Sequence, residues 1–152
     1  MLYLLCNDGN NRHNISLCDL NGQLISSWSL ILNFRESADS FVIVEDRVVV
    51  PVRRSKQLRV YSLEGELIKH INCPQMSPYS MHAICAVDSQ YVVVSSLGIS
   101  KVFRVNIDTE EVMWTTDVRN SGGVTCYGED FILVADYQSK GTTISVLDVR
   151  TG

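Results

Sequence analysis

Short apolar runs alternate with brief polar turns through the stretch from Ser40 to Cys73. The runs are rich in β-branched and aromatic residues and cover residues 41–45, 47–52, 57–63 and 66–72. Runs of this length, bounded by turn residues, are typical of β-strands. Because the intervening turns are short, the stretch predicts one four-stranded antiparallel meander, whose strands we letter A to D in chain order.

The C run and its following turn recur along the chain. The copies start at residues 15, 58, 102 and 144, at spacings of 43, 44 and 42 residues. They read Ile15-Ser-Leu-Cys-Asp-Leu-Asn-Gly22, Leu58-Arg-Val-Tyr-Ser-Leu-Glu-Gly65, Val102-Phe-Arg-Val-Asn-Ile-Asp-Thr109 and Ile144-Ser-Val-Leu-Asp-Val-Arg-Thr151. A period near 43 residues with four strands per unit indicates β-propeller blades.

The runs around these copies keep the same phase. Residues 2–6, 47–52, 91–95 and 131–135 are expected as B strands, 41–44, 82–87 and 124–127 as A strands, and 23–30, 66–72 and 112–118 as D strands. Continuous apolar runs such as Val48-Val-Val indicate strands that are covered on both faces. Helix is expected to be nearly absent, with at most one short turn in 30–40.

The pattern therefore predicts an all-β chain, a partial β-propeller of about three and a half four-stranded antiparallel blades. The single domain spans 1–152, with blades at about 1–32, 40–73, 81–118 and 122–152. The first blade lacks its inner strand and the last lacks its outer one. Since closed rings have about 4–8 blades, we expect further sequence or self-association to complete the ring.

Composition narrows the class of protein. The 152 residues are 45% hydrophobic and 20% charged, which is enough for a packed core, and no run approaches the ~18 apolar residues of a membrane span. The five cysteines form no C-x-x-C pair, so buried, reduced thiols and a cytoplasmic location are expected. They are Cys6, Cys18, Cys73, Cys85 and Cys126.

Three segments resemble those of a known family. They are Val-Asp-Ser-Gln-Tyr-Val-Val-Val (87–94), Lys-Val-Phe-Arg-Val-Asn-Ile-Asp-Thr-Glu (101–110) and the segment Gly-Val-Thr-Cys-Tyr-Gly-Glu-Asp-Phe-Ile-Leu-Val-Ala-Asp-Tyr (123–137). The chain resembles NHL-type propellers, in particular the C-terminal propellers of invertebrate tripartite-motif (TRIM) proteins. The Asn-His-Leu segment that names the family is absent, and so is any RING or B-box array. The resemblance implies a recognition module that binds a substrate protein of a ubiquitin ligase, or RNA.

Catalytic motifs are missing from the sequence. There is no G-x-S-x-G, H-E-x-x-H or phosphate-binding loop, and His13, His70 and His82 are too far apart in the repeat to predict a metal site. We expect Asp136 and Asp148 to tie turns by Asx-type hydrogen bonds. Neither a cofactor nor a metal is expected. The alternative is a fragment of a propeller enzyme, a lyase or hydrolase, with its site at the central channel.

Charge separates between the two rims of the predicted propeller. The A–B and C–D turns carry ten acids: Glu45, Asp46, Glu64, Glu66, Asp88, Asp108, Glu110, Glu111, Glu129 and Asp130. The B–C loops and D–A connections carry eight bases: Arg12, Arg35, Arg53, Arg54, Lys56, Lys101, Arg119 and Lys140. Solvated turns would explain this pattern, and so would a binding face.

A binding face on the basic side would be formed by a predicted set of side chains. The set is Arg12, Arg53, Arg54, Lys56, Lys101, Lys140 and Tyr137. Only Tyr79 and Tyr137 offer aromatic rings beside these cations, and recognition of RNA requires stacking surfaces. The scarcity of rings favours an acidic protein surface over RNA as the partner, and no membrane partner is expected.

Overall fold

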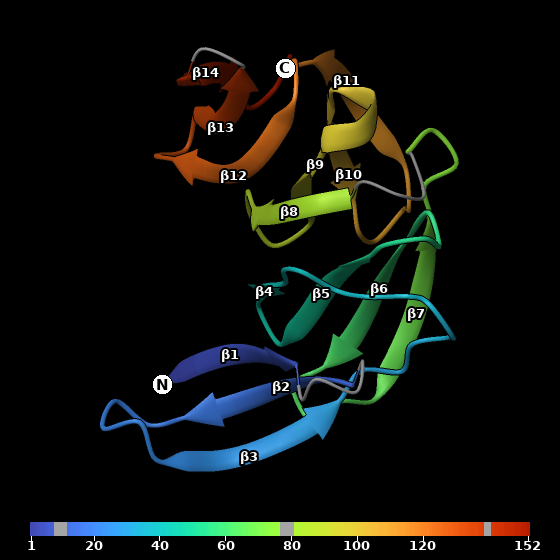
Figure 1. Ribbon diagram of the computed structural model, residues 1–152, viewed down its shortest axis with the longest axis vertical. Coiled ribbons are helices and arrows are strands. Elements are labelled where there is room, and N and C mark those ends of the chain that lie inside the picture. Colours follow the sequence, from blue (N-terminus) through green and yellow to red (C-terminus); the bar gives the residue numbers. More distant parts are fainter. Residues whose placement is uncertain (8–11, 77–80, 139–140) are drawn as a thin grey trace.

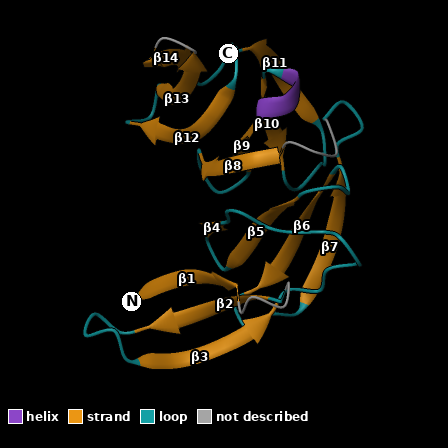
Figure 2. Ribbon diagram, viewed as in Figure 1, coloured by secondary structure: helices purple, strands orange, loops and turns teal. Residues whose placement is uncertain are grey.

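The structure, a computed structural model, describes residues 1–7, 12–76, 81–138 and 141–152. Its strands are β1 (Leu2–Asn7), β2 (His13–Cys18), β3 (Leu24–Ser29), β4 (Val42–Val44), β5 (Arg47–Val52), β6 (Gln57–Ser62), β7 (Leu67–Asn72), β8 (Met81–Ala86), β9 (Tyr91–Ser96), β10 (Lys101–Asn106), β11 (Val112–Asp117), β12 (Ser121–Tyr127), β13 (Phe131–Gln138) and β14 (Gly141–Asp148). Within the described residues, the only helix is the single 3-10 turn η1 (Leu97–Ile99), as Figure 2 shows. The turn expected in 30–40 is not helical.

The strands form four antiparallel sheets, and each sheet is one blade of a partial β-propeller. The strand orders are β1-β2-β3, β4-β5-β6-β7, β8-β9-β10-β11 and β12-β13-β14. The predicted strand succession is confirmed, including three strands in the first and last sheets. We number these sheets blades 1 to 4.

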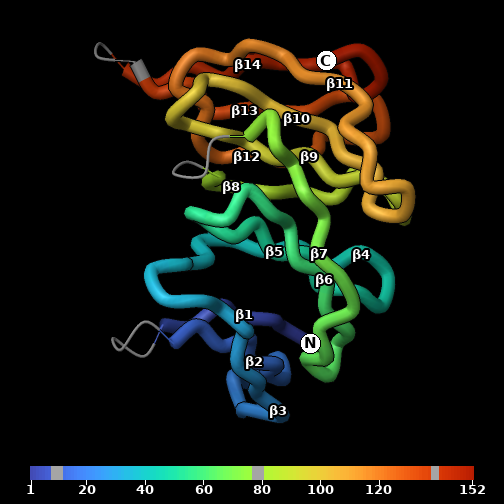
Figure 3. Tube along the Cα trace, turned by 90° about the vertical axis from the view of Figure 1, so that its right-hand side faces the viewer, coloured from blue at the N-terminus to red at the C-terminus, as the bar shows by residue number. Residues whose placement is uncertain are grey.

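The blades are stacked along an arc, with β4 and β8 on its concave side and β7 and β11 on its convex side (Figure 1). Turned by 90°, the stack runs from blade 1 at the bottom to blade 4 at the top (Figure 3). Apolar clusters fill the spaces between consecutive blades. Val48 and Val50 face blade 1, whereas Val49 faces blade 3, so β5 is covered on both faces as its continuous apolar run predicts.

Outer-strand side chains connect each blade to the C–D turn of the next. Trp28 Nε1 donates to the carbonyl of Leu63 at 3.0 Å, and Trp114 Nε1 donates to that of Val149 at 3.0 Å. At the junction of blades 2 and 3, Lys69 Nζ donates to the carbonyl of Asp108 at 3.3 Å. Each tryptophan therefore packs at a blade junction, with its one polar atom paired.

The cysteines are free, but not all are buried as predicted. Cys18, Cys73 and Cys85 are buried, Cys126 is half-buried and Cys6 is exposed. Cys6 corrects the prediction because it alternates with the inward-facing Leu5 on β1, and no blade covers its side of the sheet. None of the described helical residues forms a segment long and apolar enough to cross a membrane.

Candidate functional site

The B–C turns and the D–A connections lie at one end of the sheets, which we call the basic rim. Arg53 forms a bridge with Ser37, the N–H of Cys73 donates to Lys56 O, and the N–H of Val118 donates to Ser100 O, both at 2.9 Å. The connection 30–41 and the helix η1 lie on the same side of the stack, at the left of Figure 3. Backbone hydrogen bonds therefore fix turns and connections against each other on this rim.

The predicted binding residues that the structure describes are spread over the four blades at this rim. Arg53, Arg54 and Lys56 share the turn 53–56 of blade 2, whereas Lys101 begins β10 of blade 3. Arg12 precedes β2 and is exposed, and Tyr137 lies near the end of β13 with its ring against Gly122. Lys140 and Tyr79 lie outside the described residues.

Acidic neighbours partly neutralise the predicted cations. Arg53 pairs with Asp39 at 2.8 Å and Lys101 with Asp117 at 2.5 Å. Both are exposed pairs of the kind that contributes about 0.2–1 kcal/mol. Arg54 and Lys56 in the blade 2 turn are both exposed, and Lys56 Nζ also donates to the carbonyl of Pro74 at 3.5 Å.

A β-turn in the connection 30–41 lies beside these cations. Asn33 to Glu36 form a β-turn closed by the N–H of Glu36 donating to Asn33 O at 3.0 Å. At its tip Phe34 is 90% exposed, and the Arg35 guanidinium lies 5.2 Å from its ring centroid. Ser37, the next residue, bridges to Arg53, so this Phe34–Arg35 tip borders the cationic turn. An aromatic residue inside a polar connection was the signal that could have revealed it.

A buried ion pair anchors this tip to blade 2. Glu36 accepts from Arg59 Nη2 at 2.6 Å, from the Asn33 N–H at 2.7 Å and from Asn33 Nδ2 at 3.2 Å. Arg59 also donates to Ile31 O, which accepts in addition from the Tyr61 hydroxyl at 3.3 Å. Arg59 on β6 therefore holds the carboxylate of Glu36 inward, away from the rim surface.

Burial and pairing act in opposite directions on the carboxylate of Glu36. Desolvation raises its pKa, but the hydrogen bonds from Asn33 and Arg59, together with the charge of Arg59, lower it more, so the pKa of Glu36 lies below its ordinary value. Burial raises the pKa of Tyr61, which keeps its hydroxyl a neutral donor. The carboxylate of Glu36 is therefore ionised at neutral pH.

Left-handed backbone conformations occur at non-glycine residues on both rims, and on the acidic rim Glu45 and Glu110 have φ values of 55° and 66°. Arg35, Arg54 and Lys56 have φ values of 73°, 71° and 57°. In this left-handed region a side chain costs about 1–2 kcal/mol, and glycine is the usual residue. Three exposed cations thus occupy positions where glycine would be less strained. Strain of this kind is common at functional sites.

The opposite rim, rich in acids, is braced by ion pairs. Arg47 Nη1 contacts Asp108 Oδ1 at 2.6 Å, and Lys69 contacts Glu110 at 3.6 Å, in both cases between blades 2 and 3. Arg104 lies over the ring of Tyr91 at 4.0 Å. Some acidic side chains of this rim therefore form ion pairs that join blades 2 and 3.

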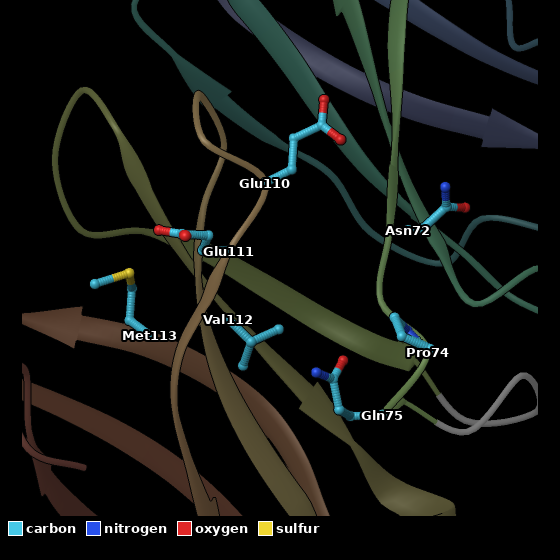
Figure 4. Close-up of a pocket in the computed structure, with 7 residues that line it drawn as sticks. All are labelled: Asn72, Pro74, Gln75, Glu110, Glu111, Val112 and Met113. Atoms are coloured by element: carbon cyan, nitrogen blue, oxygen red, sulfur yellow. The ribbon is translucent and has the colours of Figure 1, made fainter.

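A groove of about 470 Å³ opens between the outer strands of blades 2 and 3. Asn72, Pro74 and Gln75 line one side, and Glu110, Glu111, Val112 and Met113 line the other (Figure 4). The described residues of its lining include two carboxylates but no histidine, cysteine or serine side chain.

The described residues include no cluster that could hold a metal ion. Their histidine, cysteine and acidic side chains form no group of three that could hold a metal. Asp148 accepts from the N–H groups of Thr151 and Arg150, which lowers its pKa and confirms its predicted turn role. Asp136 is buried in β13.

Comparisons with known proteins show the fold. No protein-family model matches the sequence, and no curated protein matches it. Among solved structures, the chain is similar to the Pan2 WD40 domain of Neurospora crassa, with a TM-score of 0.70 and 13% identity over 96% of this chain and 43% of that one. It is similar to a chain of a nidogen/laminin complex, with a TM-score of 0.70 and 11% identity over 91% of this chain and 54% of that one. It is also similar to glutaminyl cyclase of Myxococcus xanthus, with a TM-score of 0.63 and 13% identity over 97% of this chain and 61% of that one.

These likenesses establish a β-propeller. The chain spans between 43% and 61% of the length of these three neighbours. The first two neighbours are a WD40 domain and a member of a protein complex, whereas the third is an enzyme.

Proposed function

We propose that the chain is a non-catalytic recognition module whose basic rim binds an acidic segment of a protein partner. The observation that carries this proposal is the Phe34–Arg35 tip, which the buried Arg59–Glu36 pair anchors beside Arg54. An exposed aromatic ring next to arginine is the composition of interface hot spots. The anchor reduces the entropy lost on binding, because the tip is already ordered.

The strained cations support the same proposal. Arg35, Arg54 and Lys56 each occupy a left-handed position at a cost that glycine would avoid, and their charge is the property that glycine would lose. An acidic partner would make use of the charge at these three positions. The resemblance to NHL-type propellers of tripartite-motif proteins leads to the finer proposal that the partner is the substrate of a ubiquitin ligase.

An acidic protein segment fits the rim better than RNA. Two of its cations, Arg53 and Lys101, are already paired with aspartates, and the whole chain carries a net charge of −4. RNA binding neutralises many phosphates at once, and its affinity grows with each cation contributed. A rim with few unpaired cations and the exposed ring of Phe34 suits a short segment with one apolar anchor and several carboxylates.

The test uses glycine substitutions, which remove charge without adding backbone strain. A fluorescent peptide of alternating glutamates around one leucine is titrated against the parent and against the Arg35→Gly/Arg54→Gly/Lys56→Gly variant, with a uridine 12-mer as the RNA probe. We expect the variant to bind the peptide about 3- to 150-fold more weakly, at about 0.2–1 kcal/mol for each of the three charges, and to melt within a few degrees of the parent.

Glu45→Gly is the matched control, because Glu45 has φ 55° on the opposite rim. It should leave peptide binding unchanged. Equal loss in both variants, no binding of the peptide by the parent, or preferential binding of the uridine 12-mer would contradict the proposal.

A further inference from the structure

The outward face of blade 4 is apolar and uncovered. Ile144 and Val146 on β14 are 59% and 61% exposed, and Phe131 and Tyr127 beside them are also exposed. A hollow of about 310 Å³ in this face has an almost wholly apolar lining that includes Leu133, Ala135 and Ile144. A contiguous apolar face of this kind marks a docking surface.

The repeat shows what covers this face in the other blades. Val49, Leu58 and Val60 hold the corresponding positions in blade 2, and all three are fully buried in the cluster shared with blade 3. The register is the same, since Leu133 pairs with Val146 as Val49 pairs with Val60. The outward face of blade 4 therefore corresponds to the face on which blade 2 packs against the blade that follows it.

Blade 1 exposes the complementary type of face. Leu2 and Leu4 on β1 are 50% and 40% exposed, and they point away from blade 2 because Tyr3 and Leu5 pack toward it. Their counterparts in blade 2, Val48 and Val50, are fully buried against blade 1. The outward face of blade 1 therefore corresponds to the face on which blade 2 packs against the blade that precedes it.

We infer that the outward face of blade 4 docks onto the outward face of blade 1 in a second copy of this chain, so that two copies close one ring. Two copies of four sheets give eight, within the ring sizes that propellers form. The chain also spans about half of the longer propeller chains to which it is similar. The contact is head-to-tail and occurs twice, so the assembly closes rather than growing.

The test begins with the mass of the assembled protein. Sedimentation or light scattering of residues 1–152 should give twice the chain mass of 17.0 kDa. Val146→Glu on blade 4 and Leu4→Glu on blade 1 should each abolish this species. Each would bury an unpaired carboxylate at two interfaces, which corresponds to a loss of affinity of at least about 100-fold.

The control is Ile68→Glu on β7, which is also 52% exposed but lies on the convex side, and it should leave the mass unchanged. The three substituted residues are exposed in the single chain, so each variant should remain folded and unfold cooperatively. The two disruptive variants should melt below the parent, because they lose the stabilisation that assembly provides, whereas Ile68→Glu should melt with it. An equimolar mixture of the two disruptive variants should recover a two-chain species through its one intact pair of faces.

Three outcomes would overturn the inference. The parent could sediment as a single chain, which would leave these faces to another protein or to further sequence. Its mass could rise steadily with concentration, which would indicate an open assembly. Leu4→Glu could remain two-chain while Val146→Glu did not, which would indicate that the two blade 4 faces meet each other.

Discussion

Removing one partner of the buried ion pair beneath the tip should destabilise the protein far more than removing both. Arg59→Met takes the cation away and leaves the carboxylate of Glu36, which is 9% exposed, without its closest partner. It also removes a donor to Ile31 O, which then keeps only the longer bond from the Tyr61 hydroxyl. Breaking a buried pair in this way costs about 3–5 kcal/mol.

The double variant Arg59→Met/Glu36→Leu should recover most of that loss. Without the carboxylate no buried charge remains, and the principal cost is the hydrogen bonds that Glu36 accepts from Asn33, at about 1 kcal/mol each. Because Asn33 is exposed, water can take over as the partner of its side chain. We expect the double variant to lie within about 2 kcal/mol of the parent, with a coupling energy above about 2 kcal/mol.

Thermal and urea unfolding of the four proteins of this cycle measure these values. For a chain of this size, about 1 kcal/mol shifts the Tm by roughly 2–4 °C, so Arg59→Met should melt about 6–12 °C below the parent or lower. A deficit below about 1 kcal/mol, or additive effects of the two substitutions, would refute the reasoning that the pair is buried and coupled.

The same pair gives a pH dependence of known sign. The pKa of Glu36 is lowered in the folded chain, so its contribution to stability is present above the unfolded pKa of about 4.3 and is lost as pH falls through the folded pKa. The difference in unfolding free energy between parent and Glu36→Gln should therefore shrink below about pH 4. A constant difference down to pH 2 would contradict this assignment.

Two further predictions concern the blade junctions and the thiols. Gly65→Ala should cost about 2–4 kcal/mol in urea unfolding, because its Cβ would lie 2.5 Å from Trp28 and its φ is +93°. Gly22→Ala, at the equivalent turn with φ +82° and no neighbour within 4 Å, should cost only about 1 kcal/mol, and equal costs would show that the ring contact is unimportant. Labelling of the native protein with a thiol reagent should modify the exposed Cys6 first. The thiol of Cys73 should stay unmodified until denaturation, because burial raises its pKa to about 12. Early modification of Cys73 would contradict a closed core.

Strand periodicity made the fold predictable, because burial on both faces of β5 and β9 requires unbroken apolar runs that stand out in the sequence. Turns held by an aspartate side chain could also be predicted, because the hydrogen bonds of Asp148 reach only two and three residues along the chain. The ion-pair partner of Glu36 could not be predicted, because Arg59 lies 23 residues away and the pairing depends on how the connection 30–41 folds back on β6. Charge alone marked Arg53 and Lys101 as binding residues, while their pairing with aspartates depends on local geometry.

The tip on connection 30–41 was missed because periodic patterns describe strands and are silent about irregular segments. Phe34 has the composition of a core residue, and only the closed turn from Asn33 to Glu36 turns it outward. A search for aromatic residues outside the repeat phase would have found it.

The three blade junctions differ chemically in one respect. Indole N–H groups of Trp28 and Trp114 fasten the first and third, whereas the second relies on Lys69 and on the exposed contact between Arg47 and Asp108. Mobile ions screen exposed charges but hardly affect a neutral indole bonded to a carbonyl. Raised ionic strength should therefore weaken the polar contacts of the second junction more than those of the other two, while the apolar cluster between blades 2 and 3 is unaffected by screening.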